Sequence, residues 1–441
     1  MRYSSTGGDD AGRLPSEALR RGLAADGGLY VPNALPRLEA GGKVAHLPTE
    51  AARFLAPFFE GDPLSASLED ICQEAFDFPC PRLPLESGDD CLELFHGPTA
   101  AFKDFGARFV AACSARMPRR EEEGTGPRTV IVATSGDTGG AVAAAFADQP
   151  QHQVFVLYPE GRVSPRQEQQ LTCWPRGVRA FAVAGAFDDC QRVVKEAFAR
   201  PELRASWNLT SANSINIGRL LPQAAYMWFA ARRRQAETGQ PLRPIIPTGN
   251  LGHGLAAVWA RAVGAPIGDV TLALNANRAV LDALESGQAA SREVVPTLAN
   301  AMDVAVPSNL ERLQHLFPTR EELARSVDAE SVADADIETC IRQAEDRWGF
   351  IPCPHTACAL VARDRRGPAS RTIVATAHAA KFDTIVEPLV SRAVEVPPAL
   401  GALLSRPRIK QRIAATLDGL EAAVMDPELG RVEEPGISAA S

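Results

Sequence analysis

The sequence lacks long hydrophobic runs, although hydrophobic residues make up 45% of its 441 positions. A helix that crosses a membrane needs about 20 consecutive apolar residues, and no segment comes near that length. The N-terminus is charged and rich in glycine, without the apolar core of a secretory signal. These absences predict a cytoplasmic protein that has no membrane partner.

An excess of positive charge and paired cysteines are also missing. The formal net charge of −8 disfavours nucleic acid as a partner, because phosphate backbones attract clustered positive charge. The run Arg232-Arg233-Arg234 is therefore interpreted as a solvated helix end. The nine cysteines have no Cys-x-x-Cys spacing and are expected to be reduced, mostly buried thiols. His355 and Cys358 are close in sequence, but no second pair of ligands accompanies them, so no metal site is predicted.

From residue 91 onward, short β-branched runs alternate with glycine-rich turns and alanine-rich helical segments. This alternation predicts an α/β fold with a largely parallel sheet, in which ligands bind at the carboxyl ends of strands. We expect a helical N-terminal region over 1–90, a catalytic α/β region over 91–390, and a C-terminal tail over 391–441 that is helical around Arg408–Val424 and frayed at its end. The expected strands include Thr129–Ala133, Val154–Leu157, Val178–Val183, Ile245-Ile246, Val270–Leu274 and Thr372–Ala375.

One lysine, Lys103, lies where a Gly97-Pro98 turn gives way to an apolar segment with helical spacing, 100–117. Positive charge is disfavoured in the first turn of a helix, because the macrodipole places partial positive charge there. Burial beside neighbouring phenylalanines would lower the pKa of Lys103 further, as a Schiff base with an aldehyde cofactor requires. Alternatively, Lys103 extends to the surface and pairs with Asp104.

Two glycine-rich turns follow predicted strands and begin predicted helices, where backbone N–H groups can converge on an anion. The turn over 247–254 is suited to a phosphate group, unless its glycines serve only tight packing. The turn over 135–139 offers hydroxyl and N–H groups, and Ser135 or Asp137 could instead cap the helix. A third segment, 213–219, presents two amides and a guanidinium that suit a second phosphate or a phenolic oxygen, or else form a loop with satisfied amides.

Segments along nearly the whole chain resemble those of the threonine synthases, members of the fold type II family of enzymes that use pyridoxal 5'-phosphate (PLP). The segment around Lys103 is similar to the lysine motif of that family. The other similar segments occur in the family's order and are 3–6, 26–32, 134–139, 211–216, 300–304, 354–357 and 376–382. The resemblance implies two open, largely parallel sheets flanked by helices, with the site between two subdomains.

The same resemblance implies roles for residues of these segments. Lys103 would form the Schiff base and remove the α-proton of the substrate, and the hydroxyl of Thr376 would meet the pyridine nitrogen. The remaining cofactor contacts are assigned to Gly249, Asn250, Leu251, Gly252, His253 and Asn213. The substrate contacts are assigned to Ser135, Gly136, Asp137, Thr138, Asn216 and Arg219. His378 and Lys381 are open, either as groups near the substrate phosphate or as structural residues.

The activity implied is that of a PLP-dependent carbon–oxygen lyase that converts O-phospho-L-homoserine and water to L-threonine and phosphate, as a monomer or homodimer. Four residues depart from the family pattern: Leu251 replaces an aromatic residue, His253 an Asp or Asn, Cys353 an acidic residue and Ala379 a proline. These departures keep another fold type II enzyme open, such as a serine/threonine dehydratase or a γ-substitution enzyme of secondary metabolism. A dehydratase would lack the N-terminal signature over 3–32, and a silent PLP-fold binding protein would not need Lys103.

Overall fold

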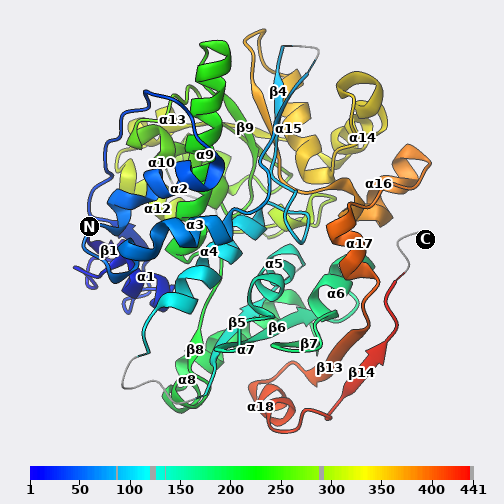
Figure 1. Cartoon of the computed structure of the whole chain (residues 1–441). Coiled ribbons are helices and arrows are strands. Elements are labelled where there is room, and N and C mark those ends of the chain that lie inside the picture. The colour runs from blue at the N-terminus through cyan, green and yellow to red at the C-terminus, as the bar shows by residue number, and fades with distance from the viewer. Residues whose placement is uncertain (86–87, 120–125, 135, 288–292, 438–441) are drawn as a thin grey trace.

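The computed structural model describes residues 1–85, 88–119, 126–134, 136–287 and 293–437 and contains two six-stranded sheets, one above the other in Figure 1. Each sheet is parallel except for one antiparallel pair, β3–β4 in the first and β13–β14 in the second. This arrangement confirms the expected α/β fold. The first sheet has the order β11 (Asp328–Ser331), β10 (Thr271–Leu274), β9 (Pro244–Pro247), β12 (Thr372–Ala375), β4 (Asp90–Glu93) and β3 (Arg82–Pro84). The second has the order β14 (Arg431–Glu434), β13 (Arg408–Ala414), β7 (Val178–Ala184), β6 (His152–Pro159), β5 (Arg128–Ala133) and β8 (Leu209–Thr210).

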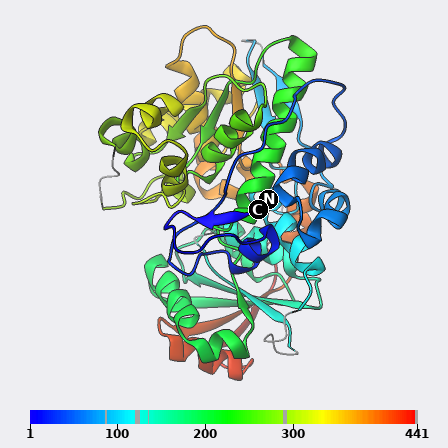
Figure 2. The ribbon, with the colours of Figure 1, turned by 90° about the vertical axis from the view of Figure 1, so that its left-hand side faces the viewer.

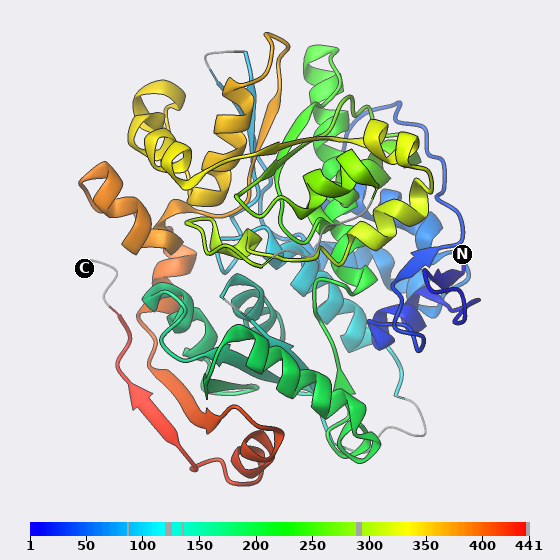
Figure 3. The same ribbon diagram turned by 180° about the vertical axis from the view of Figure 1, so that it is seen from behind.

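The strands of the first sheet are apolar on both faces, as parallel strands covered by helices require. Ile246 and Val374 point into the largest core cluster, whereas Ile245 and Ile373 point into a second cluster on the opposite face. The first face is covered by α9 (Ile217–Thr238) and α10 (Gly252–Val263), and the second by α14 (Asp334–Trp348) and α15 (Pro354–Asp364). Figure 3 shows the remaining elements of this half: α11 (Ala279–Ser286), η3 (Asn300–Met302), α12 (Leu310–Leu316) and α13 (Arg320–Ser326).

The second sheet is likewise covered on both faces. Val130 and Val154 face the large core, whereas Ile131 and Phe155 face a third cluster. The covering helices are α5 (Asp137–Phe146), α6 (Pro165–Thr172), α7 (Phe187–Ala199), α8 (Pro201–Ser206) and α18 (Leu417–Met425). The connection back from the first sheet contains η4 (Ala379–Phe382), α16 (Asp383–Val390) and α17 (Pro398–Leu404).

The C-terminal segment differs from the sequence expectation of a helical tail. Arg408–Ala414 is the strand β13, which pairs in parallel with β7, and only α18 is helical as expected. The backbone N–H and C=O groups along the edge of β7 need partners, and this pairing satisfies them even though the segment is rich in charged residues. Tertiary pairing therefore overrides the local pattern.

The N-terminal region is mainly helical, as expected, and also contains a small antiparallel pair, β1 (Tyr3–Ser5) with β2 (Tyr30–Pro32). Figure 2 shows this region beside α9, at the level where the two halves of the molecule meet. Its helical elements are α1 (Pro15–Arg21), α2 (Leu47–Leu55), η1 (Ala56–Phe59), η2 (Pro63–Ser67) and α3 (Leu68–Ala75), which pack with α4 (Lys103–Arg116). Among the helices that the structure describes, none has both the length and the apolar content of a membrane span. The nine cysteines are free thiols, and all but Cys340 are buried.

The arginine run in α9 is not the solvated helix end that its sequence suggests. Arg232 is buried and pairs with Glu50 of α2, and its other guanidinium nitrogens donate to backbone carbonyls of 40–42. Arg234 is also buried, and Arg233 is partly exposed. The prediction is wrong because acidic partners distant in sequence compensate these charges.

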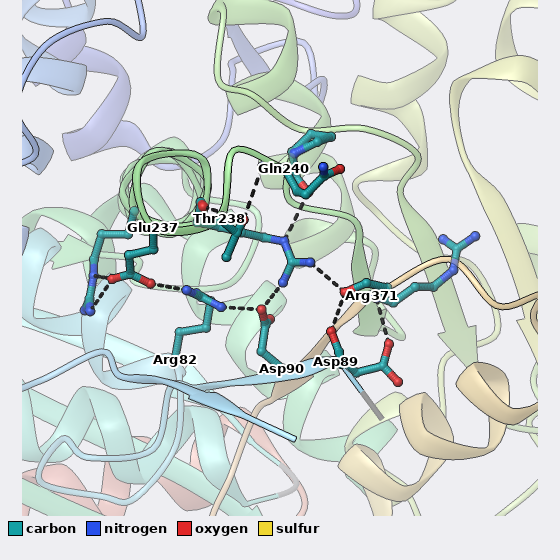
Figure 4. Close-up of polar contacts among 12 residues, drawn as sticks. Arg82, Asp89, Asp90, Glu237, Thr238, Gln240 and Arg371 are labelled. Carbon is teal, nitrogen blue, oxygen red and sulfur yellow. Dashed lines mark hydrogen bonds and ion pairs between the residues drawn. The ribbon is translucent and has the colours of Figure 1, made fainter. Parts of the chain in front are cut away.

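Arg234 belongs to a network of charged side chains around Asp90 at the start of β4. Figure 4 shows Asp90 and Arg82 of this network. The carboxylate of Asp90 accepts hydrogen bonds from Arg82 on β3 and from Arg234 on α9. Arg234 also donates to the Ser370 hydroxyl at 2.6 Å, just before β12. Asp90 is only 2% exposed, so this carboxylate joins two neighbouring strands to the longest helix in a place that water does not reach.

Candidate active site

Lys103 is the first residue of α4, at the end of a turn that begins at Gly97. Ala100 has a left-handed backbone with φ of 52°, which ends the preceding irregular segment and delays the helix beyond the expected start. Asp104 fastens the turn, because its carboxylate accepts from the N–H and the hydroxyl of Thr99 at 2.8 and 2.6 Å. The lysine position is therefore set by backbone geometry and not by its own side chain.

The same turn is tied to the end of β12. The N–H of Phe102 donates to the carbonyl of Thr376 at 2.8 Å, and the N–H of His378 donates to the carbonyl of Ala100 at 3.0 Å. These bonds place the buried Thr376 beside the residue that precedes Lys103. The structure thus brings together two segments that the sequence separates widely.

The amine of Lys103 faces Asp137 and not Asp104. Its Nζ lies 3.6 Å from Oδ2 of Asp137, and its side chain is 17% exposed. Burial lowers the pKa of Lys103, and the positive charges of Lys381 and Arg219 add to this effect against the opposing charge of Asp137. The predicted downward shift is confirmed, whereas the alternative pairing with Asp104 is wrong because Asp104 already serves Thr99.

Asp137 begins α5 and is almost completely buried. Lys381 lies 3.0 Å from its Oδ1, and the amide of Gln167 donates to the same oxygen at 3.4 Å. Burial opposes ionisation, but the charges of Lys381 and then Lys103 more than offset it, so the pKa of Asp137 lies well below its usual range. Asp137 is thus a permanent negative charge between two lysines.

The rest of the turn before α5 is shaped by Thr134, whose hydroxyl accepts from the N–H groups of Gly136 and Gly139, each at 3.0 Å. A side chain on Gly136 would place its Cβ 2.6 Å from the amide nitrogen of Gln167. Thr138 is partly exposed at the head of α5. Ser135, the first residue predicted to contact substrate, lies outside the described residues.

The turn between β9 and α10 has the shape of an anion cradle. Leu251 adopts a left-handed backbone with φ of 61°, and within the described chain no acceptor bonds the N–H groups of Leu251, Gly252 and His253. A Cβ on Gly249 would lie 2.5 Å from the Cα of Met302. Glycine is needed there for close backbone approach, and the unbonded N–H groups can receive an anion.

The side chain of Asn250 supports this turn from outside. Its amide donates to the Ser214 hydroxyl at 2.7 Å, and its carbonyl oxygen accepts from the N–H of Ser308 at 2.6 Å. Asn309 donates to the backbone carbonyl of Asn250 at 3.1 Å. The predicted direct contact of the Asn250 amide with a cofactor stays a prediction, and the hydrogen bonds describe a residue that holds the loop in place.

His253 lies beneath the lysine turn, in the first turn of α10. Its ring stacks on Phe102 with centroids 4.6 Å apart, and it meets Tyr226 edge-on at 5.6 Å. Neither ring nitrogen has a hydrogen-bond partner in the part of the chain that the structure describes, and the residue is only 3% exposed. Burial lowers the pKa of His253 to about 3, so the imidazole is neutral at physiological pH.

A His253→Phe variant is expected to resist acid better than the unmodified protein. The pKa of the histidine is about 3 when folded and 6.5 in its ordinary state, so between these values the unfolded chain binds a proton that the folded chain does not. Stability therefore falls as pH is lowered through this window, by up to about 1.4 kcal/mol per pH unit for one group. Urea unfolding at a series of pH values should give a smaller slope for the variant, and equal slopes would contradict the burial argument.

The segment before α9 places its polar groups mostly against the protein. The amide of Asn216 donates to the carbonyls of Leu19 and Ser211 at 2.8 and 2.9 Å, and its oxygen accepts from the N–H of Gly218. Asn216 is therefore the N-cap of α9, and its predicted substrate contact stays a prediction. Asn213 is half-buried at the start of this turn.

Arg219 is buried under α4. One of its terminal nitrogens donates to the carbonyl of Ala212 at 2.9 Å, while its Nε has no partner among the residues that the structure describes. Burial lowers its pKa to about 10, which still leaves the guanidinium charged. A Cβ on Gly106 would lie 2.8 Å from Nε of Arg219, so α4 approaches the guanidinium closely and holds it near the lysine turn.

His355 is a site residue to which the sequence analysis gave no role. Its Nε2 accepts from the N–H of Ala301 at 3.1 Å, in the segment that packs on Gly249. Burial lowers the pKa of His355 to about 4, while Asp137 opposes that shift. The sequence signal was available, since His355 follows Pro354 at the start of a predicted family segment.

Cys353, which replaces the expected acidic residue, is the N-cap of α15. Its sulfur accepts a hydrogen bond from the N–H of Thr356 at 3.4 Å.

Known proteins resemble this chain over nearly its whole length. Residues 91–377 match the family described as "Pyridoxal-phosphate dependent enzyme", and residues 2–76 match "Threonine synthase N terminus". Threonine synthases of Serratia marcescens and Escherichia coli are each 36% identical over 417 residues, which cover 93% of this chain and 96% of the relative. The crystal structure of the Escherichia coli threonine synthase superposes with a TM-score of 0.87 at 33% identity and covers 97% of this chain and 100% of that one.

A PLP-bound threonine synthase structure from Brucella melitensis gives the same TM-score of 0.87 at 32% identity, covering 96% of this chain and 98% of that one. A threonine deaminase of Solanum lycopersicum shares the fold at a TM-score of 0.55 but only 16% identity, covering 82% of this chain and 94% of that one. The deaminase similarity shows the fold alone. The chain belongs to the threonine synthase family of PLP-dependent enzymes.

Proposed function

We propose that this chain is a PLP-dependent threonine synthase that converts O-phospho-L-homoserine and water to L-threonine and phosphate. The observation that carries the proposal is the position of Lys103. It begins a helix at the point where the end of β12, the turn before α10 and the acidic head of α5 meet. A dehydratase assignment is disfavoured because residues 2–76 match the N-terminal region of threonine synthases.

The residues around Lys103 fit PLP. The unbonded N–H groups at the start of α10 suit a phosphate dianion at a helix N-terminus. Thr376 offers a hydroxyl just after β12. Its carbonyl accepts a hydrogen bond from the N–H of Phe102, which keeps Thr376 next to the lysine turn. When bound, PLP withdraws electrons from the substrate carbon that carries the amine, and the protein supplies orientation and charge.

Lys103 is assigned two tasks in this proposal. Its neutral amine attaches the cofactor, because a lowered pKa leaves more of the nucleophilic form at physiological pH. Once released, Nζ takes the proton from the substrate α-carbon and returns protons farther along the substrate chain. Phosphate then leaves from the γ-carbon, and water adds to the β-carbon.

The substrate brings two anionic groups that need separate partners. We assign its carboxylate to the turn over 135–138 at the head of α5. We assign its phosphate to Asn216 and Arg219, because Arg219 has a buried Nε without a partner among the described residues and guanidinium groups match phosphate geometry. Phosphate release from O-phospho-L-homoserine, compared with phosphate release from O-phosphoserine and with ammonia release from threonine, tests the assignment. Equal or faster turnover of the two other amino acids would contradict it.

A Gly252→Val variant is expected to bind PLP much more weakly while the cofactor-free protein keeps most of its stability. The new Cβ would lie 3.3 Å from the Asn309 amide, a contact that a side chain can relieve, but the branched side chain would cover the N–H groups of the cradle. Spectroscopic titration with PLP measures the affinity, and unfolding of the cofactor-free protein measures the stability. Gly249→Val is the contrasting variant, because its Cβ would meet the backbone of Met302 at 2.5 Å and should impair folding itself. Unchanged PLP affinity in Gly252→Val would move the phosphate site elsewhere.

Thr376→Val is expected to lower turnover by a factor that corresponds to about 1–3 kcal/mol, since valine keeps the volume but leaves the pyridine nitrogen without a partner. Thr376→Asp should favour a protonated nitrogen and increase side reactions such as transamination. Turnover, product analysis and the absorption spectrum of the bound cofactor measure both effects. Wild-type rates and spectra in both variants would mean that Thr376 only ends a buried strand.

A further inference from the structure

Two lysines share one buried carboxylate in the candidate site. Nζ of Lys381 lies 3.0 Å from Oδ1 of Asp137, and Nζ of Lys103 lies 3.6 Å from Oδ2 of the same group. Lys381 also donates to the carbonyl of Thr99 at 2.6 Å. The three charged residues come from three separate elements, η4, α5 and α4, so the fold and not the local sequence creates the cluster.

We propose that Lys381 is a positioning residue that engages Asp137 and thereby keeps the amine of Lys103 neutral and free to react. The inference rests on the proposed role of Lys103. A lone carboxylate beside Lys103 would favour its charged ammonium form, which is neither a nucleophile nor a base. A second cation on that carboxylate removes much of this stabilisation and adds repulsion of its own.

The amines of Lys381 and Lys103 differ in exposure, and this difference supports different roles for the two lysines. Lys381 is 1% exposed, whereas the side chain of Lys103 is 17% exposed. With bonds to both Asp137 and the Thr99 carbonyl, Lys381 faces the protein interior and is badly placed to bind a substrate phosphate. Lys103 is the more exposed of the two lysines on the shared carboxylate, and its amine lies 3.6 Å from Oδ2 of Asp137.

The charged groups that face Lys103 act in opposite directions. Burial lowers the pKa of Lys103 most; Asp137 of α5 raises it, and Lys381 of η4 and then Arg219 of α9 lower it. His355 of α15 also faces this cluster, but burial lowers its own pKa to about 4, so it is neutral at physiological pH. Lys381 is therefore the largest cationic influence on the amine, both through its own charge and by engaging the Asp137 carboxylate.

The test uses the full-length chain, freed of cofactor and mixed with PLP at a series of pH values. Borohydride traps the product, and mass spectrometry gives the rate at which Lys103 gains a pyridoxyl group. The midpoint of this rate against pH reports the amine of Lys103. In Lys381→Gln, which keeps donors for Thr99 and Asp137 without the charge, the midpoint should rise by about one pH unit, so that capture near neutral pH slows about tenfold. At high pH the two rates should converge.

Two further variants separate charge from structure. Lys381→Arg keeps the charge and should keep the wild-type midpoint. Asp137→Asn alone should lower the midpoint below the wild-type value, because the carboxylate that stabilises the ammonium is gone. Combined with Lys381→Gln, it should give a midpoint below that of Lys381→Gln alone. An unchanged midpoint in Lys381→Gln, or a rate lowered equally at every pH, would overturn the inference, as would an unchanged midpoint in Asp137→Asn. A pyridoxyl group on another lysine of the unmodified chain would instead overturn the proposed role of Lys103, on which the inference rests.

Discussion

Lys103→Ala is expected to lower turnover by on the order of 10³-fold or more, because we assign to this one amine both the attachment of the cofactor and the role of base. The fold should survive the change. Asp137 retains its ion pair with Lys381 after Lys103 is removed, so no buried carboxylate is left without a partner. The turn also keeps its shape, since Asp104 and Thr99 hold it.

Turnover of O-phospho-L-homoserine and the urea midpoint of the cofactor-free protein measure the two parts of this expectation. Lys195→Ala is a matched control, because Lys195 is exposed on α7 and far from the site in sequence and fold. Borohydride reduction of the unmodified holoenzyme should leave the pyridoxyl group on Lys103. Substantial turnover in Lys103→Ala, or an adduct on Lys381, would make the assignment wrong.

Asp90→Ala is expected to give the largest loss of stability, about 3–5 kcal/mol, because it removes the acceptor that the buried Arg234 shares with the part-buried Arg82. Arg234 is only 4% exposed and cannot turn out to solvent, since its other nitrogens bond Ser370 and the carbonyl of Pro241. Without Asp90, the positive charges of Arg82 and Arg234 lose their shared carboxylate, and this loss destabilises the folded state.

Urea unfolding of Asp90→Ala beside Asp364→Ala gives the comparison. Asp364 pairs with Arg347, whose side chain is 53% exposed, so losing that pair should cost less than about 1 kcal/mol. Equal unfolding midpoints for the two variants would mean that the buried network contributes no more than a surface ion pair.

Short β-branched runs in the sequence correctly predicted most of the central strands. Val154–Leu157 and Thr372–Ala375 lie within or coincide with β6 and β12, because strands covered on both faces must be apolar throughout. The strand β11, Asp328–Ser331, has no such signal, since it lies at a sheet edge with mostly polar side chains. The strand β13 was missed for a similar reason, and its pairing with β7 is visible only in three dimensions.

The parts of the candidate site that depend on local backbone shape could be predicted from the sequence. The turn at Gly97-Pro98 and the glycine-rich turn before α10 are local features, and both lie where their sequences indicate. The charge arrangement was not predictable, because Asp137 and Lys381 are far apart in sequence and meet only when the two halves pack together. The capping role of Asn216 was equally hidden, since one of its partners is the carbonyl of Leu19.

The strand β13 has a consequence for the order in which a ribosome would complete this molecule. In the second sheet, which precedes Asp137 through β5, the parallel strands β5 to β8 all lie between residues 128 and 210. The same sheet is completed only by residues 408–414, which pair with β7, and by β14. While the intervening half is being synthesised, the edge of β7 has no partner from its own chain, and an open strand edge invites association with other chains. The nascent chain is therefore exposed to misassembly from the completion of β7 until residues 408–414 have been made and can pair with it.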